Sequence, residues 1–154
     1  MRLALYQPEI PQNTGTLLRT AACLTVDVDI IEPCGFVFSD KHLKRAGMDY
    51  LDLAKVERLN DWAAFQELRQ NQEGRRLVLL TTKGAVPYTD FQFQENDVLL
   101  LGNEGSGVPE AVHNTVDARI IVPMSPDARS LNVAVAASMV LGEALRQTKT
   151  FPKI

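Results

Sequence analysis

The sequence predicts an α/β protein with a mainly parallel sheet, and three observations lead to this fold class. Short apolar runs alternate with segments of helical periodicity along all 154 residues. The apolar runs lead into loops that contain glycine or proline. No internal repeat, low-complexity tract or linker divides the chain. Its length is that of one domain, so residues 1–154 are expected to form a single unit.

The expected elements follow in a regular order. Apolar runs predict strands at 3–6, 28–31, 77–81, 98–101 and 119–122. Helical patterns are found at about 13–24, 41–46, 60–69 and 130–146. Asn13, Thr14 and Gly15 supply cap chemistry for the first helix, and Asn60 or Asp61 for the third. Open α/β sheets bind ligands beyond the carboxyl ends of their strands, so the loops that follow the strands are the expected site.

The composition describes an ordinary soluble globular protein. The chain has 16 Lys and Arg against 19 Asp and Glu, and 45% of its residues are hydrophobic, which excludes disordered, collagen-like and disulfide-rich chains. The net charge of -3 argues against a protein that coats nucleic acid through a general positive excess. No segment resembles a signal peptide or reaches the ~18 apolar residues of a membrane helix, so we expect a cytoplasmic protein without membrane contact.

Metal chemistry and classical nucleophiles are not indicated. The two cysteines, Cys23 and Cys34, have no zinc spacing, and the only histidines are His42 and His113. Both histidines lie in polar stretches of helical character, without a Ser or Cys context that fits a catalytic triad. We therefore expect no metal ion, and reduced, structural cysteines.

The first segment that could carry chemistry is N-T-G-T-L-L-R at 13–19. At about 100° per residue, Leu17, Leu18 and Leu24 share the apolar face of a helix, and Arg19 lies on the other side. Arg19 is either a solvated surface residue or a phosphate ligand. Its planar guanidinium can give a phosphate two hydrogen bonds beside the free N–H groups of a helix N-terminus.

The second segment is G-N-E-G-S-G-V-P at 102–109, which follows an apolar run directly. Its glycines permit positive φ and a close approach of the backbone to a ligand. The spacing matches neither the dinucleotide fingerprint nor the phosphate-loop motif. The segment is therefore either a plain glycine-rich turn or a site for a ligand of another kind.

The third segment, I-V-P-M-S-P-D-A-R-S-L-N at 121–132, joins a strand end to the last helix. Asp127 or Ser130 is expected to cap that helix, which leaves Arg129 and Asn132 without a capping role. The helix itself is apolar on nearly all sides and rich in small residues. It must be covered on two faces, so we expect it to pack inside the fold and against a second subunit.

Taken in this order, N-x-G-x-x-x-R, G-N-E-G-x-G-x-P and I-x-V-P-M-x-P-x-x-R-S-L-N resemble the three motifs of the SPOUT RNA methyltransferases. The match is closest to the small bacterial tRNA (cytidine/uridine-34) 2′-O-ribose methyltransferases. Further subgroup signatures lie at 7–15, 31–36, 44–50 and 81–84. The resemblance implies a parallel-sheet SPOUT (α/β-knot) fold with a C-terminal trefoil knot, and an obligate homodimer.

The resemblance also implies a cofactor, S-adenosyl-L-methionine, and a reaction. A ribose 2′-hydroxyl at the wobble position of the tRNA anticodon stem-loop would attack the S-methyl group. Matched by position, the residues that look like cofactor contacts are Leu80, Thr81, Gly102, Glu104, Val122, Ser130 and Leu131. Arg19 matches the arginine that is proposed as the catalytic residue in this family. A guanidinium pKa above ~12 conflicts with a role as base, so we expect Arg19 to orient an RNA phosphate and stabilise negative charge.

Asn13, Arg129 and Asn132 are expected on the substrate side of the site. The two asparagines would organise the loops around Arg19, and Arg129 would contact RNA or brace the site; each could instead be purely structural. A local basic surface across a dimer would reconcile RNA binding with the acidic chain. Its expected members are Lys41, Lys44, Arg45, Arg75, Arg76 and Lys83, together with Arg19 and Arg129.

Departures from the subgroup pattern occur at 102–107 and at Gly142, where relatives often carry tyrosine, and they bear on RNA specificity. Two alternatives stay open. Methylation at another tRNA or rRNA position would use the same three motifs. A non-catalytic RNA- or nucleotide-binding α/β protein would keep the glycine loop, but the presence of Arg19, Glu104 and Arg129 speaks against it.

Overall fold

The structure is a computed structural model that describes residues 1–38, 41, 43, 45, 53–84 and 86–154. Its strands form one seven-stranded sheet in the spatial order β3-β2-β1-β6-β4-β7-β5, and all paired neighbours are parallel. The strands are β1 (Arg2–Tyr6), β2 (Asp27–Ile31), β3 (Val56–Leu59), β4 (Leu77–Leu80), β5 (Val86–Pro87), β6 (Val98–Leu101) and β7 (Ala118–Ile121). The predicted parallel α/β class is confirmed; the trefoil knot stays a prediction.

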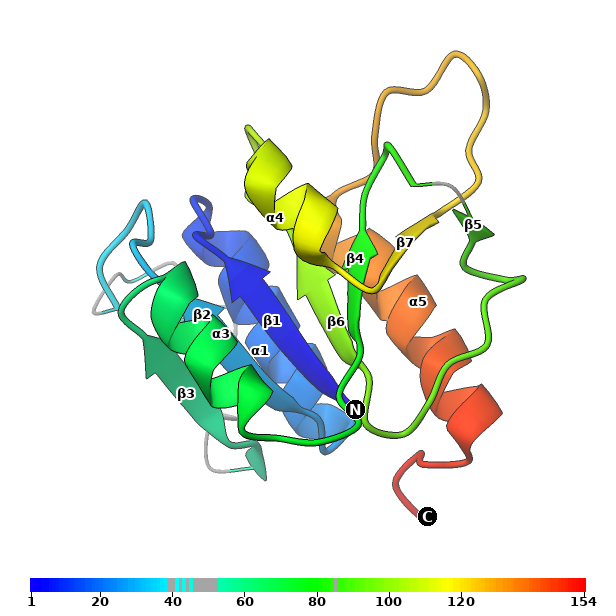
Figure 1. Cartoon of the computed structure of the whole chain (residues 1–154), viewed down its shortest axis with the longest axis horizontal. Helices are drawn as coiled ribbons and strands as arrows, with labels where there is room; N and C mark the ends of the chain where they lie inside the picture. The colour runs from blue at the N-terminus through cyan, green and yellow to red at the C-terminus, as the bar shows by residue number, and fades with distance from the viewer. Residues whose placement is uncertain (39–40, 42, 44, 46–52, 85) are drawn as a thin grey trace.

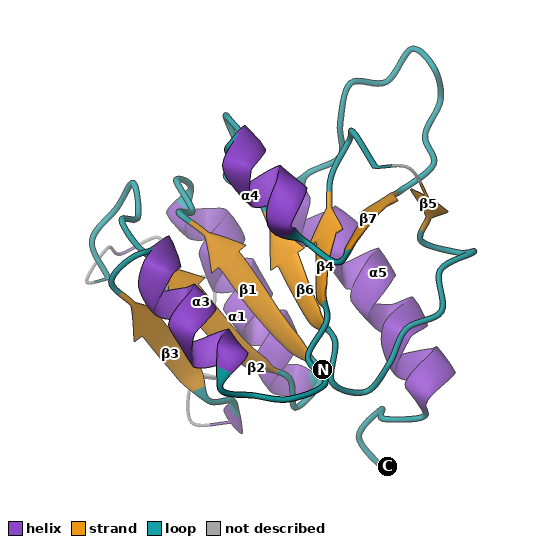
Figure 2. Cartoon of the chain, viewed as in Figure 1, coloured by secondary structure: helices purple, strands orange, loops and turns teal. Residues whose placement is uncertain are grey.

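Helices cover both faces of this sheet (Figures 1 and 2). The described helices are α1 (Pro11–Cys23), α3 (Trp62–Gln70), α4 (Glu110–Thr115) and α5 (Val133–Thr148). α1 and α5 pack against each other, and Leu18 and Leu141 belong to the same apolar core. Phe65 of α3 and Val112 of α4 belong to a second core on the opposite face. The central strands are thus buried on both sides, which explains their uninterrupted apolar sequences.

Two helices begin at other residues than predicted. α1 starts at Pro11, because proline at the first helical position needs no hydrogen-bond acceptor and already has helical φ. α5 starts at Val133, and Asn132 caps it. Neither Asp127 nor Ser130 is the cap.

Other predictions for the secondary structure have mixed outcomes. Asp61 caps α3, as predicted, through a 2.8 Å bond from Ala64 N. β3 and β5 were not predicted, since β3 carries two charged residues at the sheet edge and β5 is two residues long. The helix predicted at 41–46 falls largely outside the described residues. Among the described helices, none is long and apolar enough to cross a membrane.

Strand order brings the three motif segments together. β6 lies between β1 and β4, and β4 lies between β6 and β7. The connection to α1, the glycine-rich loop 102–109 and the loop 122–132 leave the carboxyl ends of β1, β6 and β7, so they meet at one edge of the sheet (Figure 1). This is the edge at which parallel α/β sheets bind ligands.

Candidate functional site

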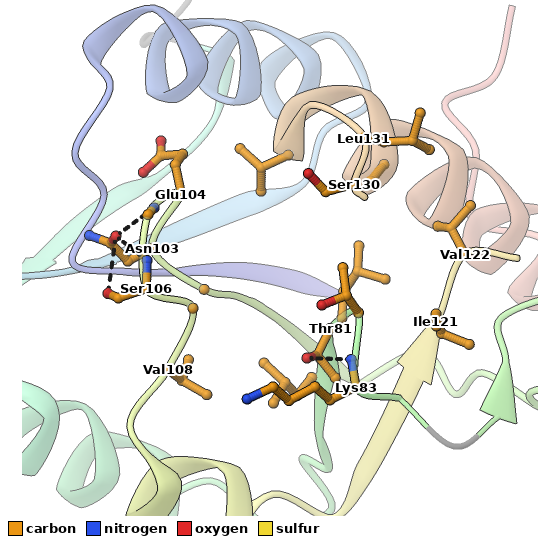
Figure 3. A pocket seen from close by; sticks show the side chains of 18 of the residues that line it. Thr81, Lys83, Asn103, Glu104, Ser106, Val108, Ile121, Val122, Ser130 and Leu131 are labelled. Atoms are coloured by element: carbon orange, nitrogen blue, oxygen red, sulfur yellow. Dashed lines mark hydrogen bonds between the residues drawn. The ribbon is translucent and has the colours of Figure 1, made fainter. Parts of the chain in front are cut away.

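A pocket of about 1100 Å³ opens at this edge (Figure 3). Its volume is slightly above the usual range for ligand pockets, ~300–1,000 Å³. All of the predicted site residues except Arg19 line it: Asn13, Leu80, Thr81, Gly102, Glu104, Val122, Arg129, Ser130, Leu131 and Asn132. The structure therefore assembles the three motif segments around one cavity.

The loop after β4 forms one wall and is held firmly to β7. Thr81 N donates to Ile120 O at 3.0 Å, and Lys83 N donates to Thr81 Oγ1 at 3.2 Å. Next to this wall, the apolar side chains of Val122 and Leu131 stand on the loop after β7 (Figure 3). This part of the pocket suits a flat, uncharged group that is bound through backbone atoms.

The glycine loop closes on itself through its backbone. Asn103 and Gly107 exchange N–H···O bonds of 2.9 and 2.8 Å. A Cβ on Gly102 would lie 2.8 Å from Gly107 Cα, and Gly107 has φ +67°. At these two positions the predicted need for glycine is confirmed, by a close approach and by a left-handed conformation.

Glu104 turns its carboxylate toward the start of α1. One oxygen accepts from Glu9 N at 2.9 Å, and the other lies 3.4 Å from Ile10 N and 3.5 Å from Asn13 Nδ2. α1 has no side-chain cap of its own, so Glu104 supplies the negative charge that a helix N-terminus favours. Glu104 lines the pocket, but its hydrogen bonds go to α1.

The two asparagines join the starts of the two helices that pack together. Asn132 Nδ2 donates to Asn13 Oδ1 at 2.9 Å. Asn132 Oδ1 accepts from Ala134 N at 2.9 Å and Val135 N at 3.2 Å. Glu104, Asn13 and Asn132 therefore connect the glycine loop, α1 and α5 in one hydrogen-bonded series, which includes all three motif segments.

Arg19 lies outside this pocket. It is exposed on α1, where it lines a separate hollow of about 430 Å³ with Thr16, Thr20, Cys23 and Leu24. Arg19 is six residues after Asn13, which is about 9 Å further along the helix axis and about 120° around it. The position away from the apolar face is confirmed, but one copy of the chain does not bring Arg19 to the pocket residues.

The expected basic surface is only partly assembled. Lys83 and Arg129 line the pocket, and Lys44 falls outside the described residues. Arg75 and Arg76 precede β4 and thus lie at the opposite edge of the sheet. Arg76 is engaged there with buried Asp97 through bonds of 2.8 and 2.7 Å, which raise the pKa of the guanidinium. Within one copy of the chain, Arg76 therefore lies away from the pocket, and its role in RNA binding stays a prediction.

Two further residues of the pocket were not predicted from the sequence. Asn103 organises the glycine loop with its side chain. His113 lines the pocket, and its Nε2 atom is buried without a hydrogen-bond partner in the described part of the chain. A side-chain amide inside a glycine-rich turn was the available signal for Asn103. Among the described residues, no group of three or more His, Cys, Asp or Glu could hold a metal ion.

Known proteins are similar to this chain over most of its length. The family model described as the SpoU rRNA Methylase family matches residues 1–142. A relative from Beijerinckia indica, named tRNA (cytidine(34)-2'-O)-methyltransferase, is 59% identical over 99% of this chain and 94% of its own. The protein of that name from Escherichia coli K12 is 42% identical, with coverage of 96% and 93%.

Two solved structures show the same architecture. One, described as "Structural insights into the 2-OH methylation of C/U34 on tRNA", superimposes with a TM-score of 0.88 and 40% identity, covering 95% of this chain and 94% of its own. The second is the SpoU methyltransferase AviRb from Streptomyces viridochromogenes in complex with AdoMet. It superimposes with a TM-score of 0.86 and 27% identity, and the match covers 96% of this chain and 60% of AviRb. The chain belongs to the SpoU rRNA Methylase family.

Proposed function

We propose that this protein transfers a methyl group from S-adenosyl-L-methionine to the 2′-hydroxyl of the wobble nucleotide, C or U at position 34, in the anticodon stem-loop of cytoplasmic tRNA. The observation that carries the proposal is the convergence of all three motif segments on one pocket at the carboxyl edge of the sheet. Relatives that bear the name of this activity match the chain over nearly its whole length.

The sequence identities of the relatives favour position 34 over a site in ribosomal RNA. An rRNA methyltransferase from Sinorhizobium meliloti is 28% identical, and the match covers 55% of that chain. The relatives named for cytidine 34 are 59% and 42% identical and are covered to 94% and 93%. In sequence, this chain thus resembles these wobble-position enzymes more than it resembles the rRNA enzyme.

The pocket fits the proposed cofactor. Leu80, Val122 and Leu131 offer an apolar surface for adenine, and the glycine loop brings backbone groups close to it. When bound, S-adenosyl-L-methionine supplies a methyl group on a sulfonium centre, which is a good leaving group. We assign Thr81, Gly102 and Ser130 to the cofactor-binding side of the pocket as well. Glu104 supports this side indirectly, because its carboxylate accepts hydrogen bonds from backbone amides at the start of α1.

We further propose that the working enzyme is a homodimer in which Arg19 of one protomer reaches the pocket of its partner. α5 has an apolar outer face, with Val135 51% and Met139 42% exposed, and Leu131 in the loop before it is 41% exposed. Space is open around Gly142 on the same helix. The same helix packs against α1, and its residues Val133 and Ala136 line the pocket. A second copy packed there would cover the face and bring its Arg19 to the pocket, which Arg19 of the same chain does not line.

The role proposed for Arg19 follows from guanidinium chemistry. It holds an RNA phosphate through two hydrogen bonds and stabilises the negative charge that develops on the 2′-oxygen. A phosphate oxygen or water then takes the proton, because arginine stays protonated. Arg129, exposed at the rim of the pocket, is assigned to the RNA backbone. Arg19→Lys keeps the charge but loses the paired hydrogen bonds, so turnover should fall sharply.

The experiment that tests the function combines cofactor binding with product analysis. Calorimetric titration should detect S-adenosyl-L-methionine binding to the wild-type protein. Mass spectrometry of nucleosides should then find 2′-O-methylcytidine or 2′-O-methyluridine at position 34 of tRNA, and none after the same reaction with Arg19→Ala. Binding without methylation of any tRNA, or methylation of ribosomal RNA instead, would contradict the assignment.

Mixed dimers test the contribution of Arg19 across the interface. One variant is Arg19→Ala, and the other is Ser130→Trp, which fills the pocket from an exposed loop position. If Arg19 acts on the partner, a mixed dimer has one site without either change, and activity returns when two inactive variants are combined. If Arg19 acts within its own chain, every site carries one change and the mixture stays inactive. Light scattering should give twice the 17.1 kDa of one chain.

A further inference from the structure

Asn103 uses both ends of its side-chain amide. Its Oδ1 accepts from Gly105 N at 2.9 Å, Ser106 N at 3.1 Å and Ser106 Oγ at 3.3 Å. These bonds hold the glycine loop in its closed form (Figure 3). Its Nδ2 donates to the carbonyl of Gln7 at 2.6 Å, across 96 residues of sequence. One side chain therefore shapes the loop that lines the pocket and binds that loop to the connection between β1 and α1.

Gln7 has an unusual backbone conformation at the receiving end of this bond. Its φ is +44°, in the left-handed region that residues with a Cβ adopt infrequently. Gln7 N donates to Ile31 O at 2.8 Å, and Gln7 O accepts from Asn103. Hydrogen bonds on both sides of the residue thus hold the turn that leads into α1.

The residue after Asn103 holds the second half of the same turn. Glu104 accepts from Glu9 N and Ile10 N, so two consecutive residues of the glycine loop bind both halves of the β1–α1 connection. That connection fixes where α1 begins, and α1 carries Asn13 and Arg19. The relative position of loop and helix therefore depends on Asn103 as well as on Glu104.

We propose that Asn103 is a positioning residue for methyl transfer: it fixes the cofactor loop relative to the helix that carries Asn13 and Arg19. The proposal rests on the proposed function. Asn103 does not need to touch either substrate, because it acts through the backbone of Gly105 and Gln7. Methyl transfer needs alignment of oxygen, carbon and sulfur, and small errors in such alignment lower the rate strongly.

The two ends of the amide can be separated by substitution. Asn103→Asp keeps an oxygen that can accept from Gly105 and Ser106, but it replaces the donor to Gln7 with a negative oxygen that repels the carbonyl. Asn103→Ala removes both sets of bonds. Ser106→Ala is the matched control, since it removes one hydroxyl bond to the same Oδ1 and leaves the backbone bonds in place.

The expected result is a split between cofactor binding and turnover. Asn103→Asp should bind S-adenosyl-L-methionine within about threefold of wild type, while kcat at saturating tRNA falls about tenfold or more. Asn103→Ala should weaken cofactor binding about tenfold as well, and Ser106→Ala should change either quantity less than about threefold. Wild-type kcat for Asn103→Asp, measured well below its unfolding temperature, would overturn the proposal even if the variant is less stable.

Hydrogen exchange supplies a readout that does not need activity. Amides of residues 2–10 should exchange faster in Asn103→Asp than in wild type and Ser106→Ala. Unchanged exchange there would refute the link to Gln7. A wild-type protein that neither binds the cofactor nor methylates tRNA would refute the proposed function instead, and the exchange experiment would still decide whether Asn103 holds the turn.

Discussion

Asn132 donates a 2.9 Å hydrogen bond to Asn13 across 119 residues of chain. The direction of this hydrogen bond is fixed by the other partners of both side chains. Asn132 Oδ1 already accepts from the first amides of α5, and Asn13 Nδ2 lies toward the carboxylate of Glu104, which can only accept. The bond ties two walls of the pocket together, and reversing it would place oxygen against oxygen.

Asn132→Asp should preserve the helix cap and break this bond. Aspartate caps helices about as well as asparagine, so the unfolding midpoint should stay close to wild type. A carboxylate oxygen would face Asn13 Oδ1, and kcat/KM for tRNA should fall about tenfold. Thermal unfolding and initial rates check both parts. Asn132→Ala, which also loses the cap, should cost about 1 kcal/mol of stability. Full activity of Asn132→Asp would contradict a role for the bond.

Gly102→Ala should open the glycine loop, because its Cβ would lie 2.8 Å from Gly107 Cα. We expect cofactor affinity to fall about tenfold, as calorimetry can measure, since the lining of the pocket moves. Gly142→Ala is the control. Within one chain, no atom of the described residues lies within 4 Å of its added Cβ, so in α5 it should raise stability by up to about 1 kcal/mol through helix propensity. Wild-type affinity for Gly102→Ala would show that the loop tolerates the displacement.

Arg76→Ala should destabilise the fold without weakening RNA binding by the folded protein. It leaves the carboxylate of Asp97, which is 0% exposed, without its cation. We expect a loss of about 2 kcal/mol, below the range for a fully buried pair because a third of the Arg76 side chain is exposed. Urea unfolding and tRNA titration separate the two effects. Arg75→Ala removes the same charge from the neighbouring position and serves as the control. A selective loss of RNA affinity in Arg76→Ala would show that Arg76 binds RNA.

Cys34 should react slowly with alkylating reagents. Burial, together with the charges of Glu32 and Glu104, raises the pKa of its thiol to about 11. At pH 8 the thiolate that reacts is then about one part in a thousand. Iodoacetamide labelling of Cys23→Ser, followed by mass spectrometry, should be far slower in the folded protein than in urea. Equal rates in both states would show that the Cys34 pKa is not raised.

Glu143 should contribute to stability in a pH-dependent way. Hydrogen bonds from Arg146 and Gln147 lower the pKa of its carboxyl to about 2. A lowered carboxyl pKa stabilises the folded state above the unfolded value, near 4.5, and this contribution disappears as the pH falls from there toward 2. The difference in unfolding midpoint between wild type and Glu143→Gln should narrow over that interval. An NMR titration of Glu143 with a midpoint near 4.5 would refute the shift.

Strands were predictable where both of their faces are buried, because every residue of such a strand is then apolar. The runs at 77–80 and 98–101 are apolar throughout because helices cover both faces of the sheet there. Val56–Leu59 escaped prediction because an edge strand keeps charged side chains in water. The cap of α5 was assigned wrongly because Asp127, Ser130 and Asn132 are all competent caps, and only the path of the loop selects among them.

The sequence predicted which residues line the pocket, but not the hydrogen bonds that join them. Resemblance placed Glu104 and Asn132 at the pocket, but their hydrogen bonds to the start of α1 span 95 and 119 residues, which no local pattern records. For Arg19, the sequence predicted the helix face but not the distance from the pocket. Helical periodicity correctly put it away from the apolar face of α1, yet the same geometry puts it outside the pocket, and its contribution depends on what lies beyond one chain.

The long span between Asn13 and Asn132 has a consequence for synthesis of the protein. The start of α1 leaves the ribosome early, but its partner for closing the pocket is made only when most of the chain has been translated. A truncated or still-growing chain therefore has no complete cavity and cannot sequester the cofactor. Cofactor binding would therefore stabilise only the complete, folded chain, so a bound cofactor indicates that folding is complete.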